Sequence, residues 1–154
     1  MPELVFNSPV GLLALVASGR AITSLEWRKA ASNQKTKTLL LVKKELTQYF
    51  SGELTEFTVP LDPSGTAFQR RVWKTIVEIP FGERRTYRDI ANTLNSSPRA
   101  VGGACSRNPI PIIVPCHRVV GINGSLTGYT GADGLNTKLF LLEHESRPTS
   151  QLGR

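Results

Sequence analysis

A cysteine and a histidine stand next to each other at the end of a stiff, proline-rich stretch of the chain, residues 108–120 (NPIPIIVPCHRVV). A thiol is a poor nucleophile until a base takes its proton, and a neighbouring imidazole is a usual base. The three prolines restrict the backbone around the thiol. This pattern indicates Cys116 as a nucleophile and His117 as its base. The plainer alternative is a small buried thiol beside a structural histidine.

A base of this kind needs a third group that orients it. Glu143 and Glu145, in the last predicted helix, are the two candidates, and their spacing alone does not decide between them. Adjacent residues of an extended segment point to opposite sides, so a direct bond between Cys116 and His117 requires a turn, with a bridging water as the alternative. Asn108 either forms a turn or anchors the cysteine loop through its side-chain amide.

The elements that position these residues belong to a basic protein of ordinary composition. The chain has 154 residues, of which 40% are apolar and 20% charged, enough for one or two compact domains. Its net charge of +7 is uneven: residues 1–65 hold seven Lys/Arg against six Asp/Glu, and residues 66–154 hold twelve against six. A basic C-terminal part favours a polyanionic partner, although a basic surface also serves solubility alone.

Several classes of protein are disfavoured. Two cysteines, Cys105 and Cys116, are too few for a secreted disulfide scaffold and lack the CxxC spacing of zinc sites. We therefore expect no metal and no cofactor. No apolar run is long enough to span a bilayer, and residues 1–20 do not resemble a signal peptide. The expectation is a cytoplasmic protein, monomeric in solution and without a membrane partner.

Short apolar runs separated by turns open the chain and predict a small antiparallel meander. An amphipathic helix and one more short strand follow. The expected elements are strands at 3–7, 11–17, 21–27 and 56–60 and a helix at 39–50. Residues 62–65 (DPSG) interrupt this pattern, so we expect one domain over residues 1–62, a second over 66–147, and a frayed tail over 148–154.

The second part carries a helix-turn-helix pattern. Thr86 with Asp89 three residues later is a helix start signal, and after a short turn Ser97 can cap a second helix that has Pro98 at its first position. Helix, three-residue turn and helix is the order typical of that motif. The expected elements are helices at 68–79, 87–94 and 98–107, a hairpin turn at 123–124, and a final helix that begins near 134.

The second helix of this pair is unusually rich in small residues. It contains Ala100, Gly102 and Gly103, and each glycine costs roughly 1 kcal/mol relative to alanine in a helix. Either another molecule approaches this backbone closely, or the helix packs tightly against a neighbour. Arg99 and Arg107 at the two ends of the helix favour DNA as the approaching molecule.

Taken together, these residues resemble the O6-alkylguanine-DNA alkyltransferases. The resemblance rests on residues 68–91, 98–131 and 138–145, and it covers essentially the whole C-terminal part, whereas the N-terminal part matches weakly. It implies an α/β (α+β) fold, with a small RNase-H-like N-terminal α/β domain followed by a mostly helical, winged helix-turn-helix domain. It also implies direct DNA repair: the protein transfers an alkyl group from O6 of guanine to its own cysteine, irreversibly and once per molecule.

The resemblance further implies roles for five residues. Cys116 is the alkyl acceptor, with a thiol whose pKa is lowered. His117 draws the thiol proton through a water, and Glu145 rather than Glu143 orients that histidine. Asn108 braces the active-site turn. Tyr87 crowds the target phosphate and donates a proton to the departing guanine.

The partner implied is double-stranded DNA, bound through its minor groove. An alkylated base inside a duplex cannot reach a thiol in the protein, so the nucleotide is rotated out of the stack, at a cost of a few kcal/mol. Arg99 resembles the side chain that fills the gap in the stack. The other DNA contacts expected are Ala100, Gly102, Gly103, Arg107 and Arg118, and the pocket is expected to include Tyr129 and Thr130.

Three other kinds of function fit parts of this pattern less well. A transcription factor would rest on the helix-turn-helix alone, and the glycine-rich second helix suits base-edge readout poorly. A cysteine hydrolase would use Cys116, His117 and Glu145, would turn over repeatedly and would ignore DNA. A lesion-binding relative would bind alkylated DNA without repairing it, but such relatives lack the acceptor cysteine. Residues 131–135 (GADGL) are longer than the corresponding family stretch, which leaves open the range of alkyl groups accepted. Activity on alkylthymine is open as well.

Overall fold

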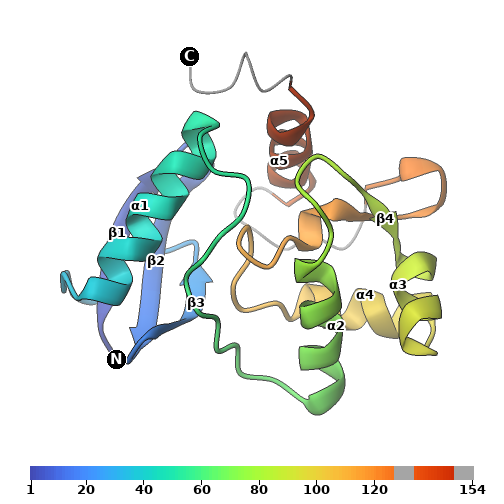
Figure 1. Ribbon diagram of the computed structural model, residues 1–154, viewed down its shortest axis with the longest axis horizontal. Coiled ribbons are helices and arrows are strands. Elements are labelled where there is room, and N and C mark those ends of the chain that lie inside the picture. Colours follow the sequence, from blue (N-terminus) through green and yellow to red (C-terminus); the bar gives the residue numbers. More distant parts are fainter. Residues whose placement is uncertain (127–133, 148–154) are drawn as a thin grey trace.

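The computed structural model describes residues 1–126 and 134–147 of the chain. The protein has the mixed α/β fold expected from the sequence: a three-stranded sheet with helix α1 in the N-terminal part, and a group of helices in the C-terminal part (Figure 1). A connected set of buried apolar side chains runs through both parts, from Leu4 in the sheet to Leu141 in the last helix. No helix within the described ranges is both long and apolar enough to cross a membrane.

The predicted meander is confirmed. It consists of β1 (Glu3–Ser8), β2 (Gly11–Ser18) and β3 (Ala21–Glu26), paired antiparallel in the order β1-β2-β3. Gly11, the first residue of β2, and Gly19, in the turn after β2, both have positive φ, a conformation that costs a glycine little.

Helix α1 (Lys37–Ser51) covers one face of this sheet (Figure 1). The side chain of Thr36 caps its first turn by accepting a hydrogen bond from the Leu39 amide, and Gly52 ends it in the left-handed conformation. The face of α1 that packs inward includes Tyr49, whose side chain is completely buried. The helix therefore carries a phenol hydroxyl into the interior of the molecule.

The strand predicted at residues 56–60 is wrong. The amides of Thr58 and Val59 donate instead to the carboxylate of Glu45, at 3.0–3.1 Å and 3.0 Å, and the Thr58 hydroxyl donates to it at 2.7 Å. A side chain of α1 thus takes the place of a neighbouring strand, and the segment joins the sheet only by an isolated bridge at Leu61. Glu45 is an acidic residue on the otherwise apolar inward face of α1. The apolar pattern of residues 56–60 suggested a strand because it gives no sign of this distant carboxylate.

The helix-turn-helix predicted in the C-terminal part is confirmed. Helix α3 begins with a capping box formed by Thr86 and Asp89, and α4 begins with the Ser97 cap and Pro98 at its first turn. The elements are α2 (Ala67–Val77), β4 (Arg85–Thr86), α3 (Tyr87–Leu94), α4 (Pro98–Ser106), η1 (Cys116–Arg118), β5 (Val119–Val120), η2 (Ile122–Gly124) and α5 (Leu135–Ser146).

Two predicted details differ from the structure. The first helix of this part ends at Val77, two residues before Ile79, although Ile79 is buried as the pattern indicated. Asn123 and Gly124 do form a turn with positive φ at both residues, but the turn belongs to the short 3-10 segment η2 rather than to a paired hairpin within the described residues.

Two hydrogen bonds fix the helices around the cysteine segment. The indole N–H of Trp73 in α2 donates to the carbonyl of Ala104 in α4 at 2.9 Å. The amide of Leu25 in β3 donates to the carbonyl of Pro109, also at 2.9 Å. The first bond joins α2 to α4. The second joins the segment that ends at Cys116 to the N-terminal sheet, and the Asn108 amide joins the start of that segment to the Cys105 carbonyl of α4 at 3.2 Å.

Candidate active site

The loop before Cys116 is held by the side chain of Asn108. Its amide nitrogen donates to the Val114 carbonyl at 2.9 Å and to Cys116 Sγ at 3.2 Å, and its amide oxygen accepts from the Ile110 amide at 2.9 Å. Asn108 therefore has both of the roles considered: the bond from the Ile110 amide closes a turn, and the amide nitrogen anchors the loop. Ile112 within this loop has a φ of 76°, a strained value for a β-branched residue.

The backbone turns at the cysteine itself. Residues Cys116–Arg118 form the 3-10 turn η1, so Cys116 and His117 do not alternate as they would in an extended strand. The His117 side chain points toward α5, where its Nε2 lies 2.7 Å from Glu145 Oε2. The other ring nitrogen, Nδ1, is buried and has no hydrogen-bond partner within the described residues.

Glu145 accepts hydrogen bonds from three side chains. Its Oε2 receives His117 Nε2, the Tyr49 hydroxyl at 2.6 Å and Arg118 Nη2 at 3.0 Å, and its Oε1 receives Arg118 Nε at 2.8 Å. Glu145 is buried, whereas Glu143 is exposed. Of the two glutamates, the one that faces the histidine is therefore Glu145.

The charge state of this pair follows from its surroundings. Burial acts to raise the pKa of Glu145, but the His117 imidazole and the Arg118 guanidinium outweigh it and hold that pKa well below its usual range. Burial lowers the pKa of His117, with Glu145 opposing the shift. A neutral imidazole beside an ionised carboxylate donates through Nε2, which leaves the lone pair on Nδ1. The pair is thus arranged to accept a proton at Nδ1.

The thiol of Cys116 is more weakly acidic than the sequence led us to expect. A hydrogen bond with Cys105 and burial together raise the pKa of the Cys116 thiol well above its usual value. The amide of Asn108 and the ammonium of Lys138 act in the opposite direction. The expectation of a lowered pKa is therefore wrong for this structure, because the side chain is only 4% exposed and has a second thiol beside it.

Lys138 was missed in the sequence. Its side chain is 1% exposed, and its Nζ donates to the Val119 carbonyl at 2.6 Å and to the Tyr87 hydroxyl at 3.4 Å. Burial lowers the pKa of Lys138 to about 8. Its position in the helix could have indicated that it is buried. Lys138 lies three residues before Leu141, four before Leu142 and seven before Glu145, so it shares their inward face.

Tyr87 stands at the start of α3, half-buried, with the Lys138 ammonium 5.6 Å from its ring centroid. The lysine therefore links the phenol to the cysteine, because its charge also acts on Cys116. Of the five residues that the sequence singled out for chemistry, Asn108 contacts Cys116, Glu145 contacts His117, and Tyr87 contacts Lys138.

The other described parts of the protein do not pack closely against the two glycines of α4. A methyl group added at Gly103 would meet nothing within 4 Å, and one added at Gly102 would come no closer than 4.0 Å to Tyr87. Tight packing inside the protein therefore does not require either glycine, which favours the other interpretation, close approach by another molecule. Arg99 and Arg107, at the two ends of this helix, are both exposed.

Arg118 does not lie where the sequence analysis expected it. We expected it to contact DNA, but the structure buries it to 5% exposure and bonds it to Glu145 and to the Ile79 carbonyl, the latter at 2.7 Å. The reason is the 3-10 turn, which directs Arg118 inward along with its two predecessors. The two residues expected to line the pocket, Tyr129 and Thr130, lie outside the described residues. Within the described ranges, no three His, Cys, Asp or Glu side chains are grouped as metal ligands.

Comparison with known proteins gives a consistent result over nearly the whole chain. Residues 3–63 match the model for "6-O-methylguanine DNA methyltransferase, ribonuclease-like domain", and residues 67–147 match the model for the DNA binding domain of the same family. A methylated-DNA–protein-cysteine methyltransferase of Mycobacterium leprae is 45% identical over 148 residues, covering 90% of this chain and 88% of that protein. One of Methanosarcina acetivorans is 42% identical over 151 residues, covering 92% and 96%.

Solved structures agree with the sequence matches. Mycobacterium tuberculosis OGT in complex with DNA has a TM-score of 0.85 and 45% identity, over 94% of this chain and 92% of that one. An O6-methylguanine DNA methyltransferase from Methanococcus jannaschii has a TM-score of 0.72 and 30% identity, over 94% of each chain. On the matched models and these relatives, the chain belongs to the 6-O-methylguanine DNA methyltransferase family.

Proposed function

We propose that this protein repairs O6-alkylguanine in double-stranded DNA by moving the alkyl group onto Cys116, once per molecule. The observation that carries the assignment of Cys116 is its setting. Asn108 holds the sulfur at 3.2 Å, and the next residue is a histidine whose Nδ1 has no hydrogen-bond partner in the described part of the chain and can accept a proton. The thiol is weakly acidic in this setting, so a base is needed to activate it. His117, oriented by Glu145, is that base.

The reaction is a single displacement at a saturated carbon. Cys116 Sγ forms a bond to the alkyl carbon as the bond from that carbon to guanine O6 breaks. The thiol proton passes to His117 Nδ1 through a bridging water. The Tyr87 hydroxyl gives a proton to the departing guanine, and the ammonium of Lys138 favours the phenolate that remains. The thioether is not hydrolysed, so the protein is consumed.

Helix α4 forms the surface that we propose binds DNA. In this proposal Arg99 enters the gap left by the extruded nucleotide, Arg107 binds a phosphate, and the small residues Ala100, Gly102 and Gly103 let the minor groove come close. A DNA substrate and two free cysteines both suit a reducing compartment, so a cytoplasmic location is part of the proposal. A monomeric state is proposed as well. The domain limits 1–62 and 66–147 are also part of the proposal.

Intact-mass analysis tests the function directly. After incubation with duplex DNA that contains O6-methylguanine, the protein should gain about 14 Da, the mass of one methylene unit, and peptide mapping should locate it at Cys116. A Cys116→Ser variant should gain nothing, and Cys105→Ser should be labelled as fully as wild type. Repeated turnover with no lasting mass gain would point to a hydrolase instead, and labelling of Cys105 would overturn the choice of acceptor.

Gly103→Ala should have opposite effects on stability and on DNA binding. The added methyl group is free of clashes inside the protein, so the helix should gain up to about 1 kcal/mol of stability. In the minor groove the same methyl group overfills the contact, and we expect affinity for duplex DNA to fall about tenfold. Urea unfolding and fluorescence anisotropy measure the two quantities.

The control for this prediction is Thr47→Ala, at an exposed position of α1 in the other part of the molecule. That variant should also gain helix stability without any loss of affinity. If Gly103→Ala binds DNA as tightly as wild type, α4 does not form the close contact proposed.

A further inference from the structure

Tyr49 connects the N-terminal part of the molecule to the proposed catalytic histidine. It lies on α1, 96 residues before Glu145 in the chain, and its hydroxyl donates to Glu145 Oε2 at 2.6 Å. This is the same carboxylate oxygen that accepts from His117 Nε2. The residue lies outside the range 67–147 that matches the DNA binding domain, so the catalytic carboxylate receives one of its hydrogen bonds from the other part of the chain.

The Tyr49 ring is fixed from several sides. Aromatic rings surround it, with centroid distances of 5.0 Å to Phe50, 5.5 Å to Phe57 and 6.1 Å to Phe81. The neighbour of Glu145 in α5, His144, reaches back and bonds through its Nε2 to the Tyr49 carbonyl at 2.8 Å. Because ring and backbone are both held, the hydroxyl has a defined direction toward the carboxylate.

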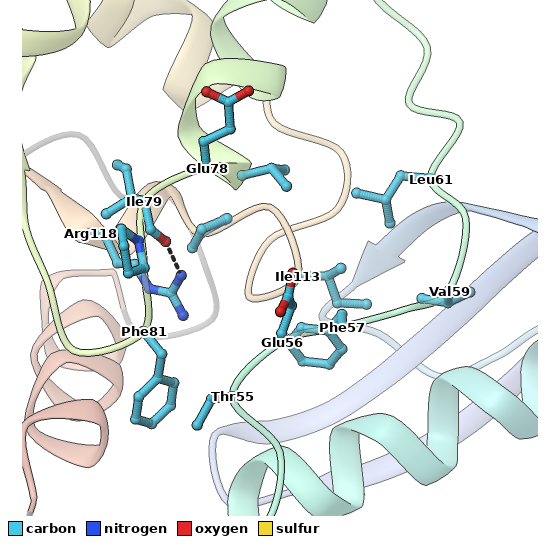
Figure 2. Close-up of a pocket in the computed structure, with 13 residues that line it drawn as sticks. Thr55, Glu56, Phe57, Val59, Leu61, Glu78, Ile79, Phe81, Ile113 and Arg118 are labelled. Atoms are coloured by element: carbon cyan, nitrogen blue, oxygen red, sulfur yellow. Dashed lines mark hydrogen bonds between the residues drawn. The ribbon is translucent and has the colours of Figure 1, made fainter.

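The junction between the two parts combines buried apolar packing with an open pocket. A cavity of about 650 Å³ lies at this junction (Figure 2). Phe57 and Leu61 line it from the connecting segment, and Ile113 and Arg118 line it from the cysteine segment. The Arg118 guanidinium points toward the Ile79 carbonyl in Figure 2, beside this cavity. Neither Tyr49 nor Glu145 lines this cavity, so the hydrogen bond between them is a separate contact across the two parts.

We propose that Tyr49 is a positioning residue for alkyl transfer, whose hydroxyl holds the Glu145 carboxylate in the orientation that serves His117. The inference rests on the proposed function. The hydroxyl also takes up part of the carboxylate's negative charge, which makes His117 a weaker base than it would be beside Glu145 alone. The other charged groups that act on His117 are Glu145 itself, Arg118 and Lys138, and none of them changes in the test below.

The test is Tyr49→Phe, which removes one oxygen and keeps the ring. Its rate of methyl transfer from O6-methylguanine in duplex DNA, measured in a single turnover, should fall by about tenfold, part of what a positioned base contributes. The pKa of His117 should rise by roughly half a unit to one unit, because one hydrogen bond no longer competes for the carboxylate's charge. NMR can follow that titration directly, since the chain contains two histidines.

Phe57→Leu is the matched control, because it removes a ring packed on Tyr49 and leaves the hydroxyl in place. It should leave the His117 titration unchanged. An unaltered His117 titration and rate in Tyr49→Phe, or an equal shift in Phe57→Leu, would overturn the proposal. If wild type accepts no methyl group at all, the proposed function fails instead, and the histidine titration still reports on the role of Tyr49.

Discussion

Replacing His117 with glutamine should slow methyl transfer to Cys116 by roughly 10²–10⁴-fold at neutral pH. Burial and Cys105 raise the pKa of the Cys116 thiol, so little thiolate is present without a base. Glutamine can still donate an amide N–H toward Glu145, but it cannot take up the thiol proton. Single-turnover kinetics with duplex DNA containing O6-methylguanine measures the loss.

The pH dependence of the loss identifies its cause. As the pH rises toward the pKa of the Cys116 thiol, the thiolate forms without help, and the rates of the variant and of wild type should converge. If glutamine merely disturbed the fold, the deficit would stay constant with pH. A constant deficit would therefore remove His117 from the role of base and leave it as a structural residue.

The sequence predicted most of the C-terminal part because its signals are local. A helix start depends on residues three apart, so Thr86 with Asp89 could be read directly, and the same holds for Ser97 followed by Pro98. The segment around Cys116 was also legible, because prolines and neighbouring functional residues mark it within a single stretch.

The remaining features depend on contacts between distant segments. Glu45 takes the place of a neighbouring strand by accepting hydrogen bonds from the amides of residues 58–59, and the sequence of that stretch does not indicate this contact. Tyr49 looks like one more apolar residue on α1 until its partner 96 residues away is known. Arg118 follows a pattern that suggested a DNA contact, and only the turn at Cys116 shows that it faces inward. In these three cases, the spacing of residues along the sequence did not predict the direction in which the side chain points.

Replacing Glu145 with alanine should lower the free energy of unfolding by about 3–5 kcal/mol and abolish rapid methyl transfer. The side chains of Glu145 and Arg118 are 1% and 7% exposed, so removing the carboxylate leaves a buried cation without its partner anion. Arg118 would keep its bond to the Ile79 carbonyl, and His117 would lose the acceptor for Nε2. Urea unfolding at neutral pH measures the stability loss.

A double variant separates the buried charge from the rest of the effect. If the loss comes mainly from an unpaired Arg118, then Glu145→Ala combined with Arg118→Met should be more stable than Glu145→Ala alone. A double variant as unstable as the sum of the single changes would mean that the two side chains contribute independently.

Acid pH provides a second measurement of the same network. The folded pKa of Glu145 lies below its ordinary value near 4.5, so the folded protein holds fewer protons than the unfolded chain at moderately acid pH. The stability that this carboxylate contributes is therefore complete above about pH 4.5 and is lost as the pH falls below it. Wild type should lose stability over that range more steeply than the double variant, which has neither the carboxylate nor its cation. Equal slopes would show that the Glu145 network is not what acid disrupts first. The rate loss in the single variant would then have to come from the orientation of His117 alone.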